Sequence, residues 1–162
     1  MTTNIRNYGI AIGRLAQEVK VGKLHRDGSV RVFFTLACPN NYKNSDDGSR
    51  DAQFISFTAF LPSRMTGLTA AQVESAGPNA CKLTPGLGPF SLLHKGDLIA
   101  VQYHIESSSY VDKQTGETKY VQNLCAQSID FLESQQAVAD RQKRLQQESA
   151  GVFCGTFSNF DS

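Results

Sequence analysis

The sequence predicts an all-β domain in which five strands close into a Greek-key barrel, with a short helix between the third and fourth strands. Two observations predict it. Segments of alternating residues recur between clusters of turn-forming residues, and one Gly/Pro-rich stretch interrupts this rhythm after the third segment. The chain has 162 residues, of which 40% are hydrophobic, which is enough for one domain and a tail.

The first strand is expected over residues 8–21, where Ile10 and Ile12 alternate with small residues. Gly13 lies in the middle of this strand, where we expect a bulge or a bend. A turn over 23–29, with Asp27-Gly28 as its signal, leads into a second strand over 30–38. That strand has two faces: Val32, Phe34, Leu36 and Cys38 lie on one, and Arg31, Phe33, Thr35 and Ala37 on the other.

The third strand, residues 53–60, is the most informative segment. One face carries Ile55, Phe57 and Ala59 and is typical of a core. The other places Phe54 and Phe60 among small hydroxyl side chains, which makes a poor core but a good platform for flat rings. A soluble protein seldom leaves two such rings on a polar face without a use, and stacking of nucleobases is the use that this pattern favours.

The remaining elements follow in order. Thr69 is expected to cap a short helix over 69–76, and residues 77–89, with three Gly and three Pro, are expected to form a loop. A fourth strand over 98–109 and a fifth over 120–131 are joined by a long hairpin tip. The predicted domain therefore spans 1–133, followed by a weakly helical or disordered tail over 134–162.

Bulk composition excludes several classes of protein. No apolar run approaches a membrane span and the N-terminus lacks a signal-peptide core, so a cytoplasmic location is expected. The four cysteines are scattered and the three histidines have no metal-ligand spacing, so we expect no disulfide, metal or cofactor. No catalytic motif is present, which predicts a protein that is not an enzyme. The net charge is +1, but residues 1–64 hold nine Lys/Arg against five Asp/Glu.

Five strands with a helix between the third and fourth are the pattern of an OB-fold. Over residues 4–133 the sequence resembles the bacterial single-stranded DNA-binding proteins. The resemblance depends on the order and spacing of short motifs rather than on any one of them. These motifs are IAIGRL at 10–15, FTLA at 34–37, RDAQFIS at 50–56, KGDLIAV at 95–101, SYVD at 109–112, KYV at 119–121 and SIDFLE at 128–133.

The resemblance implies a nucleoid-associated homotetramer that coats single-stranded DNA with little sequence preference in replication, recombination or repair. Its base-stacking positions match Tyr42, Phe54, Phe60 and Tyr110, and its basic positions match Arg14, Lys43, Arg50 and Lys95. Lys113 and Lys119 in the hairpin are further candidates for phosphate contacts. The alternative is an OB-fold module that binds proteins in a replication or conjugation complex.

The chain also departs from the family's usual pattern. It has no Trp, and it carries His104 and Ser108 where relatives tend to carry Arg. The stretch 77–89 resembles an insertion, and the usual acidic C-terminal tip is missing, so the family's usual protein partners are not implied.

Overall fold

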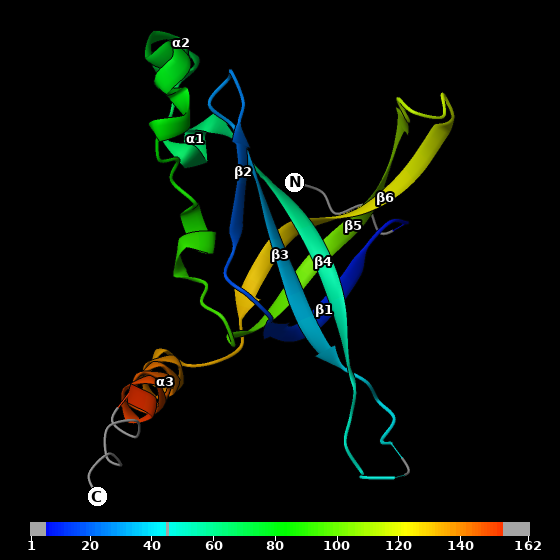
Figure 1. Cartoon of the computed structure of the whole chain (residues 1–162), viewed down its shortest axis with the longest axis vertical. Coiled ribbons are helices and arrows are strands. Elements are labelled where there is room, and N and C mark those ends of the chain that lie inside the picture. The colour runs from blue at the N-terminus through cyan, green and yellow to red at the C-terminus, as the bar shows by residue number, and fades with distance from the viewer. Residues whose placement is uncertain (1–5, 45, 154–162) are drawn as a thin grey trace, which may run out of the picture. The chain divides into compact units, whose positions relative to one another are not determined.

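The computed structural model describes residues 6–44 and 46–153 (Figure 1). Strands dominate the first part of the chain, and short helices connect the fourth strand to the fifth. The strands are β1 (Gly9–Leu15), β2 (Lys20–Leu24), β3 (Val30–Pro39), β4 (Ala52–Leu61), β5 (Leu98–Val111) and β6 (Thr118–Phe131). The helices are α1 (Ser63–Thr66), α2 (Ala70–Ala76), α3 (Gln135–Phe153) and the 3-10 turns η1 (Gly77–Lys82) and η2 (Gly88–Leu92).

Five of the strands close into a ring in the order β1, β5, β6, β4, β3 and back to β1. All the pairings are antiparallel except the one between β4 and β6, which is parallel. β2 extends the sheet beyond β3 and is not part of the ring. The arrangement confirms the all-β, OB-fold barrel that the sequence predicts.

The expected single first strand over 8–21 is wrong: it is two strands, β1 and β2. After Leu15 the chain leaves β5, and the amide of Ala16 donates to the carbonyl oxygen of Thr35 on β3 at 2.8 Å. The break follows from closure of the barrel, because the chain must change there from pairing with β5 to pairing with β3. Gly13 marks a close approach rather than a bulge, since a Cβ at Gly13 would lie 2.7 Å from the Ala37 carbonyl oxygen.

The turn after β2 is also shorter than expected, because β2 runs through Leu24 and the turn begins at His25. Gly28 in this turn has φ +83°, and a Cβ there would meet the carbonyl oxygen of Leu68 at 2.1 Å. Only glycine fits both the backbone angle and the space. The hydroxyl of Thr66 then donates to the Gly28 carbonyl oxygen at 2.6 Å, which ties the turn to α1.

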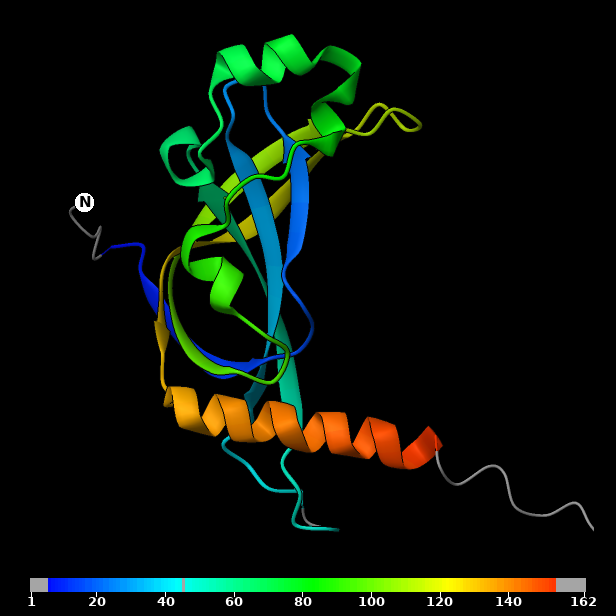
Figure 2. The same ribbon diagram turned by 90° about the vertical axis from the view of Figure 1, so that its left-hand side faces the viewer.

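The core lies inside the ring and is built from the inward faces that the alternation predicts. Phe34 and Phe57 stack with their centroids 5.5 Å apart, and Phe90 packs on Phe34 at 5.6 Å. Phe90 belongs to η2, so the predicted loop over 77–89 is partly wrong: the connection folds into two 3-10 turns, of which η2 contributes to the core. Figure 2 shows this connection running beside β2.

The N-terminus of α2 is confirmed as predicted. The Thr69 hydroxyl accepts from the amide of Gln72, and the Gln72 side chain accepts from the amide of Thr69. This reciprocal pair is a capping box and satisfies two amides that the helix itself leaves unbonded.

The chain divides into two compact units, residues 1–131 and 132–162. In the second unit α3 is a regular helix, and Arg141 pairs with Glu133 ahead of it. The end of the chain, with its three Phe residues, lies mostly beyond residue 153 and outside the described residues. The sequence-based domain boundary after residue 133 stays a prediction. None of the described helices is long and apolar enough to cross a membrane.

Candidate nucleic-acid interface

The outward side chains of β3 and β4 form one continuous surface, which we call the outer face. Cross-strand pairing fixes its rows, because paired residues point to the same side of a sheet. The Thr35 and Ser56 hydroxyls lie 3.1 Å apart across the middle of it. The rows are Arg31 with Phe60, Phe33 with Thr58, Thr35 with Ser56 and Ala37 with Phe54.

Aromatic rings on the outer face are open to solvent. Phe54 is 69% exposed and Phe60 is 56% exposed, whereas Phe57, between them on the inward side, is 2% exposed. Phe54 and Phe60 are six residues apart, or about 20 Å along a strand, so they can contact different parts of one extended ligand.

The two predicted tyrosines lie on extensions of the barrel rather than on the outer face of β3 and β4. Tyr42 is 86% exposed in the loop between β3 and β4, and Tyr110 is 53% exposed near the end of the long β5–β6 hairpin (Figure 1). Phe54 and Phe60 thus share one surface of the sheet. Tyr42 and Tyr110 lie on two separate extensions of the barrel, the β3–β4 loop and the β5–β6 hairpin.

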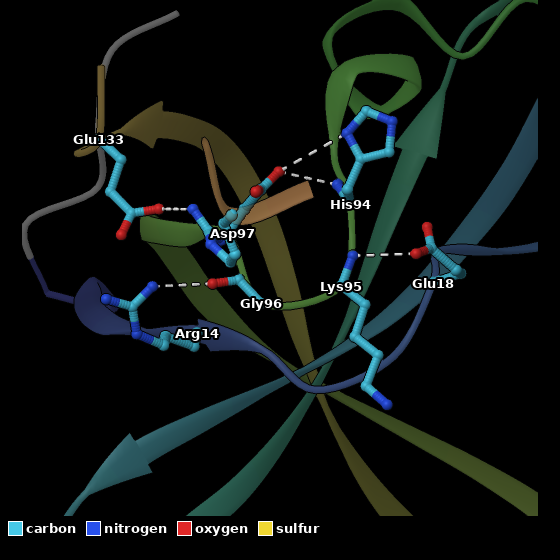
Figure 3. Close-up of polar contacts among 8 residues, drawn as sticks. Arg14, Glu18, His94, Lys95, Gly96, Asp97 and Glu133 are labelled. Carbon is cyan, nitrogen blue, oxygen red and sulfur yellow. Dashed lines mark hydrogen bonds and ion pairs between the residues drawn. The ribbon is translucent and has the colours of Figure 1, made fainter. Parts of the chain in front are cut away.

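Two of the predicted basic residues are involved in contacts that join β1 and its continuation to the loop before β5 (Figure 3). Arg14 donates from Nη1 to the carbonyl oxygen of Gly96 at 2.9 Å. At Lys95 it is the backbone amide that is bonded, to Glu18 Oε1 at 3.0 Å, and the ammonium group extends away from that contact.

The other predicted basic residues lie in exposed loops and in the hairpin. Lys43 and Arg50 are exposed in the β3–β4 loop, and Lys113 is exposed at the hairpin tip. Lys119 forms an ion pair with Asp112 across the hairpin. The Lys119 ammonium, followed by the amide of Gln114, lowers the pKa of the Asp112 carboxyl.

Sequence reasoning missed two residues of the outer face, Phe33 and Arg31. Phe33 is 44% exposed beside Thr58, and Arg31 is exposed beside Phe60. The alternation of 30–38 carried this signal, because it already places both residues on the face opposite to the core. Arg31 and Phe60 also line an open recess of about 460 Å³, together with His25, Arg26, Asp27 and Ser29.

The outer face continues across β6 onto β5. Thr58 pairs with Cys125, and Cys125 pairs with His104. His104 Nε2 lies 2.9 Å from Glu106 Oε1, and this hydrogen bond is the main cause that lowers the pKa of Glu106. Burial, and then the neighbouring Glu106 carboxylate, raise the pKa of the Cys125 thiol to about 11.

These features define a class of protein: an OB-fold barrel in which the second and third strands of the ring, β3 and β4, present an open aromatic face. In OB-folds that surface is the usual one for binding oligonucleotides and oligosaccharides.

Comparison with known proteins narrows the class. The chain is 27% identical over 127 residues to single-stranded DNA-binding protein 2 of Clostridium acetobutylicum, covering 78% of this chain and 77% of that protein. It is 28% identical over 142 residues to the single-stranded DNA-binding protein of Staphylococcus aureus strain MRSA252, covering 83% and 76%. No protein-family model matches the chain. Over about four fifths of its length, the chain is thus similar to bacterial single-stranded DNA-binding proteins.

Proposed function

We propose that this protein binds and coats single-stranded DNA with little sequence preference. The observation that carries the proposal is the row of exposed rings on the outer face, with Phe54 and Phe60 at its two ends. Every nucleobase has a flat face that can stack on an aromatic ring, so such contacts bind single strands without reading their sequence. Duplex DNA hides those base faces inside its stack.

Tyr42 and Tyr110 extend this surface in the proposal. Their exposure, 86% and 53%, leaves the rings open to bases on either side of the barrel's outer face. Cations lie in the same segments as these rings: Lys43 and Arg50 are in the loop of Tyr42, and Lys113 and Lys119 are in the hairpin of Tyr110. Phosphate contacts from these residues, and from Lys95 and Arg14, would release counterions and strengthen binding.

A homotetramer acting in DNA replication, recombination or repair completes the proposal. The support for self-association is the outward side of β1, where Ile10 is 57% exposed and Ile12 is 54% exposed. Two adjacent branched apolar side chains on one strand are a surface that a second copy can bury. Light scattering after size-exclusion chromatography tests the assembly directly, and a monomer at micromolar concentration would contradict it.

The binding proposal is tested with a fluorescently labelled oligo-dT, titrated with the full chain at two salt concentrations. Tight binding that weakens with salt, together with far weaker binding to a duplex of the same length, is the expected result. Absence of binding at low salt would contradict the proposal and would favour a protein-binding OB module.

A further inference from the structure

We propose that His104, Glu106 and Cys125 form a binding site for one zinc ion on the outer face, where β5 pairs with β6. One donor atom from each side chain, an imidazole nitrogen, a carboxylate oxygen and the thiol sulfur, lies within 4.8 Å of the others. Among the described residues, no other group of three or more His, Cys, Asp or Glu side chains meets this geometry.

The register of the sheet brings the three side chains together. His104 and Cys125 are direct partners across the β5–β6 pair, and Glu106 lies two residues beyond His104 on the same side of β5. Because strand residues alternate between faces, a spacing of two places His104 and Glu106 next to each other on one face. The sequence alone gives no metal motif, since Cys125 is nineteen positions from Glu106 and joins the site only through the hairpin.

The chemistry of the three donors selects the ion. Thiolate, imidazole and carboxylate ligands together suit zinc, whereas calcium and magnesium prefer oxygen ligands alone. Zinc bonds of about 2.0–2.3 Å in a tetrahedron place ligand atoms roughly 3.3–3.8 Å apart. Side-chain movements of about 1 Å would therefore bring the three donor atoms to the spacing of zinc ligands, with water as a fourth ligand.

A second observation concerns the other nitrogen of the same imidazole ring, since Nε2 is the one that faces Glu106. Nδ1 of His104 is buried and has no hydrogen-bond partner among the described residues. A buried polar atom without a partner is uncommon and calls for an explanation such as an unseen water or ion. The His104 side chain remains 27% exposed and that of Glu106 58% exposed, so an ion can enter from solvent.

One nearby charge opposes the ion. The Arg31 guanidinium acts electrostatically on both Glu106 and Cys125. The Glu106 carboxylate, and the Cys125 thiolate formed when zinc displaces the thiol proton, offset it with two negative charges at the site. We therefore expect binding that is measurable with the metal alone, without DNA, so the result does not depend on the proposed function.

The test uses the full chain, reduced, stripped of metal with a chelator, and titrated with zinc chloride in a calorimeter. We expect one zinc per chain in the wild type, and a loss of affinity of about tenfold or more in Cys125→Ser and in His104→Gln. Cobalt is the second probe, since coordination by sulfur gives an intense near-ultraviolet absorption. That absorption is expected in the wild type and absent from Cys125→Ser.

The matched control is Cys38→Ser, which removes another half-buried, unbridged thiol of the described chain. It should bind zinc and cobalt as the wild type does. If Cys125→Ser fails to fold, Glu106→Gln replaces it, because that side chain is largely exposed. Absence of zinc binding in the wild type, or unchanged binding in His104→Gln and Glu106→Gln, would overturn the proposal.

Discussion

Replacing Phe60 with alanine is the most direct test of the outer face. A base stacked on an aromatic side chain contributes about 1–3 kcal/mol in OB-fold proteins that bind single strands, a general range for which bacterial single-stranded DNA-binding proteins are one of the examples. Phe60 is 56% exposed, so most of the ring is available to a base. We expect Phe60→Ala to weaken binding of oligo-dT by about 5-fold to 150-fold, measured by fluorescence anisotropy at fixed salt.

The same substitution should have only a modest effect on folding. A little under half of the Phe60 side chain is covered in the folded chain, and complete burial of such a side chain is worth about 1.5–3 kcal/mol. The expected loss in the free energy of unfolding is therefore about 1 kcal/mol. A urea titration measures this loss separately, so weaker DNA binding can be distinguished from unfolding.

Two further variants separate stacking from general apolar contact. Phe60→Tyr keeps the flat ring and should bind nearly as the wild type does. Leu92→Ala removes an apolar side chain that is 64% exposed on η2, away from the outer face, and should leave affinity unchanged. If Phe60→Ala binds oligo-dT with wild-type affinity while remaining folded, Phe60 is not a stacking residue and the assignment of the outer face is refuted.

Three other predictions follow from the remaining parts of the structure. Replacing both Lys43 and Arg50 with alanine should reduce the magnitude of the slope of log affinity against log salt by about 1.4, because each lost phosphate contact contributes about 0.7. Anisotropy titrations at several salt concentrations measure the slope. An unchanged slope would contradict the role of these residues. Phe90→Ala should lower the free energy of unfolding by about 3 kcal/mol in urea, because Phe90 is 7% exposed in the core, and a loss below 1 kcal/mol would contradict its role there. In Lys119→Met, the pKa of Asp112 measured by NMR should rise toward its ordinary value. Because that pKa is lowered in the folded chain, the ion pair stabilises the hairpin at neutral pH, and this stabilisation is lost as pH falls through the pKa. An unmoved pKa would contradict the pairing.

Local patterns made the barrel predictable. The alternation in β3 and β4 gives their inward faces directly, and Phe34 and Phe57 indeed stack inside the ring. Thr69 could be identified as a helix cap because the capping box lies within four consecutive residues. The capping box is an interaction between residues close in sequence, and in β3 and β4 the alternation of side chains alone indicates which side is buried.

Contacts between distant segments were not predictable in the same way. The break between β1 and β2 depends on where β1 meets β3, and no residue near Ala16 signals it. In β1 the small residues face the barrel, and the larger Ile10 and Ile12 are exposed. Alternation revealed the two faces there but not which one is inward, because the tight closure at Gly13 favours small side chains over large ones.

The distribution of charge on the structure suggests how binding is divided between stacking and phosphate contacts. Arg14 and Lys119, two of the cations expected to contact phosphate, already bond within the chain, to Gly96 and Asp112. Those partners take up part of the donor capacity of each cation, and Asp112 also offsets the charge of Lys119, so their net contribution is smaller than that of a solvated lysine. Glu106 adds a negative charge on β5. In the proposed binding mode, the rings of the outer face then supply a larger share of the affinity. Binding should weaken less steeply with salt than it would for a chain with all six cations unengaged.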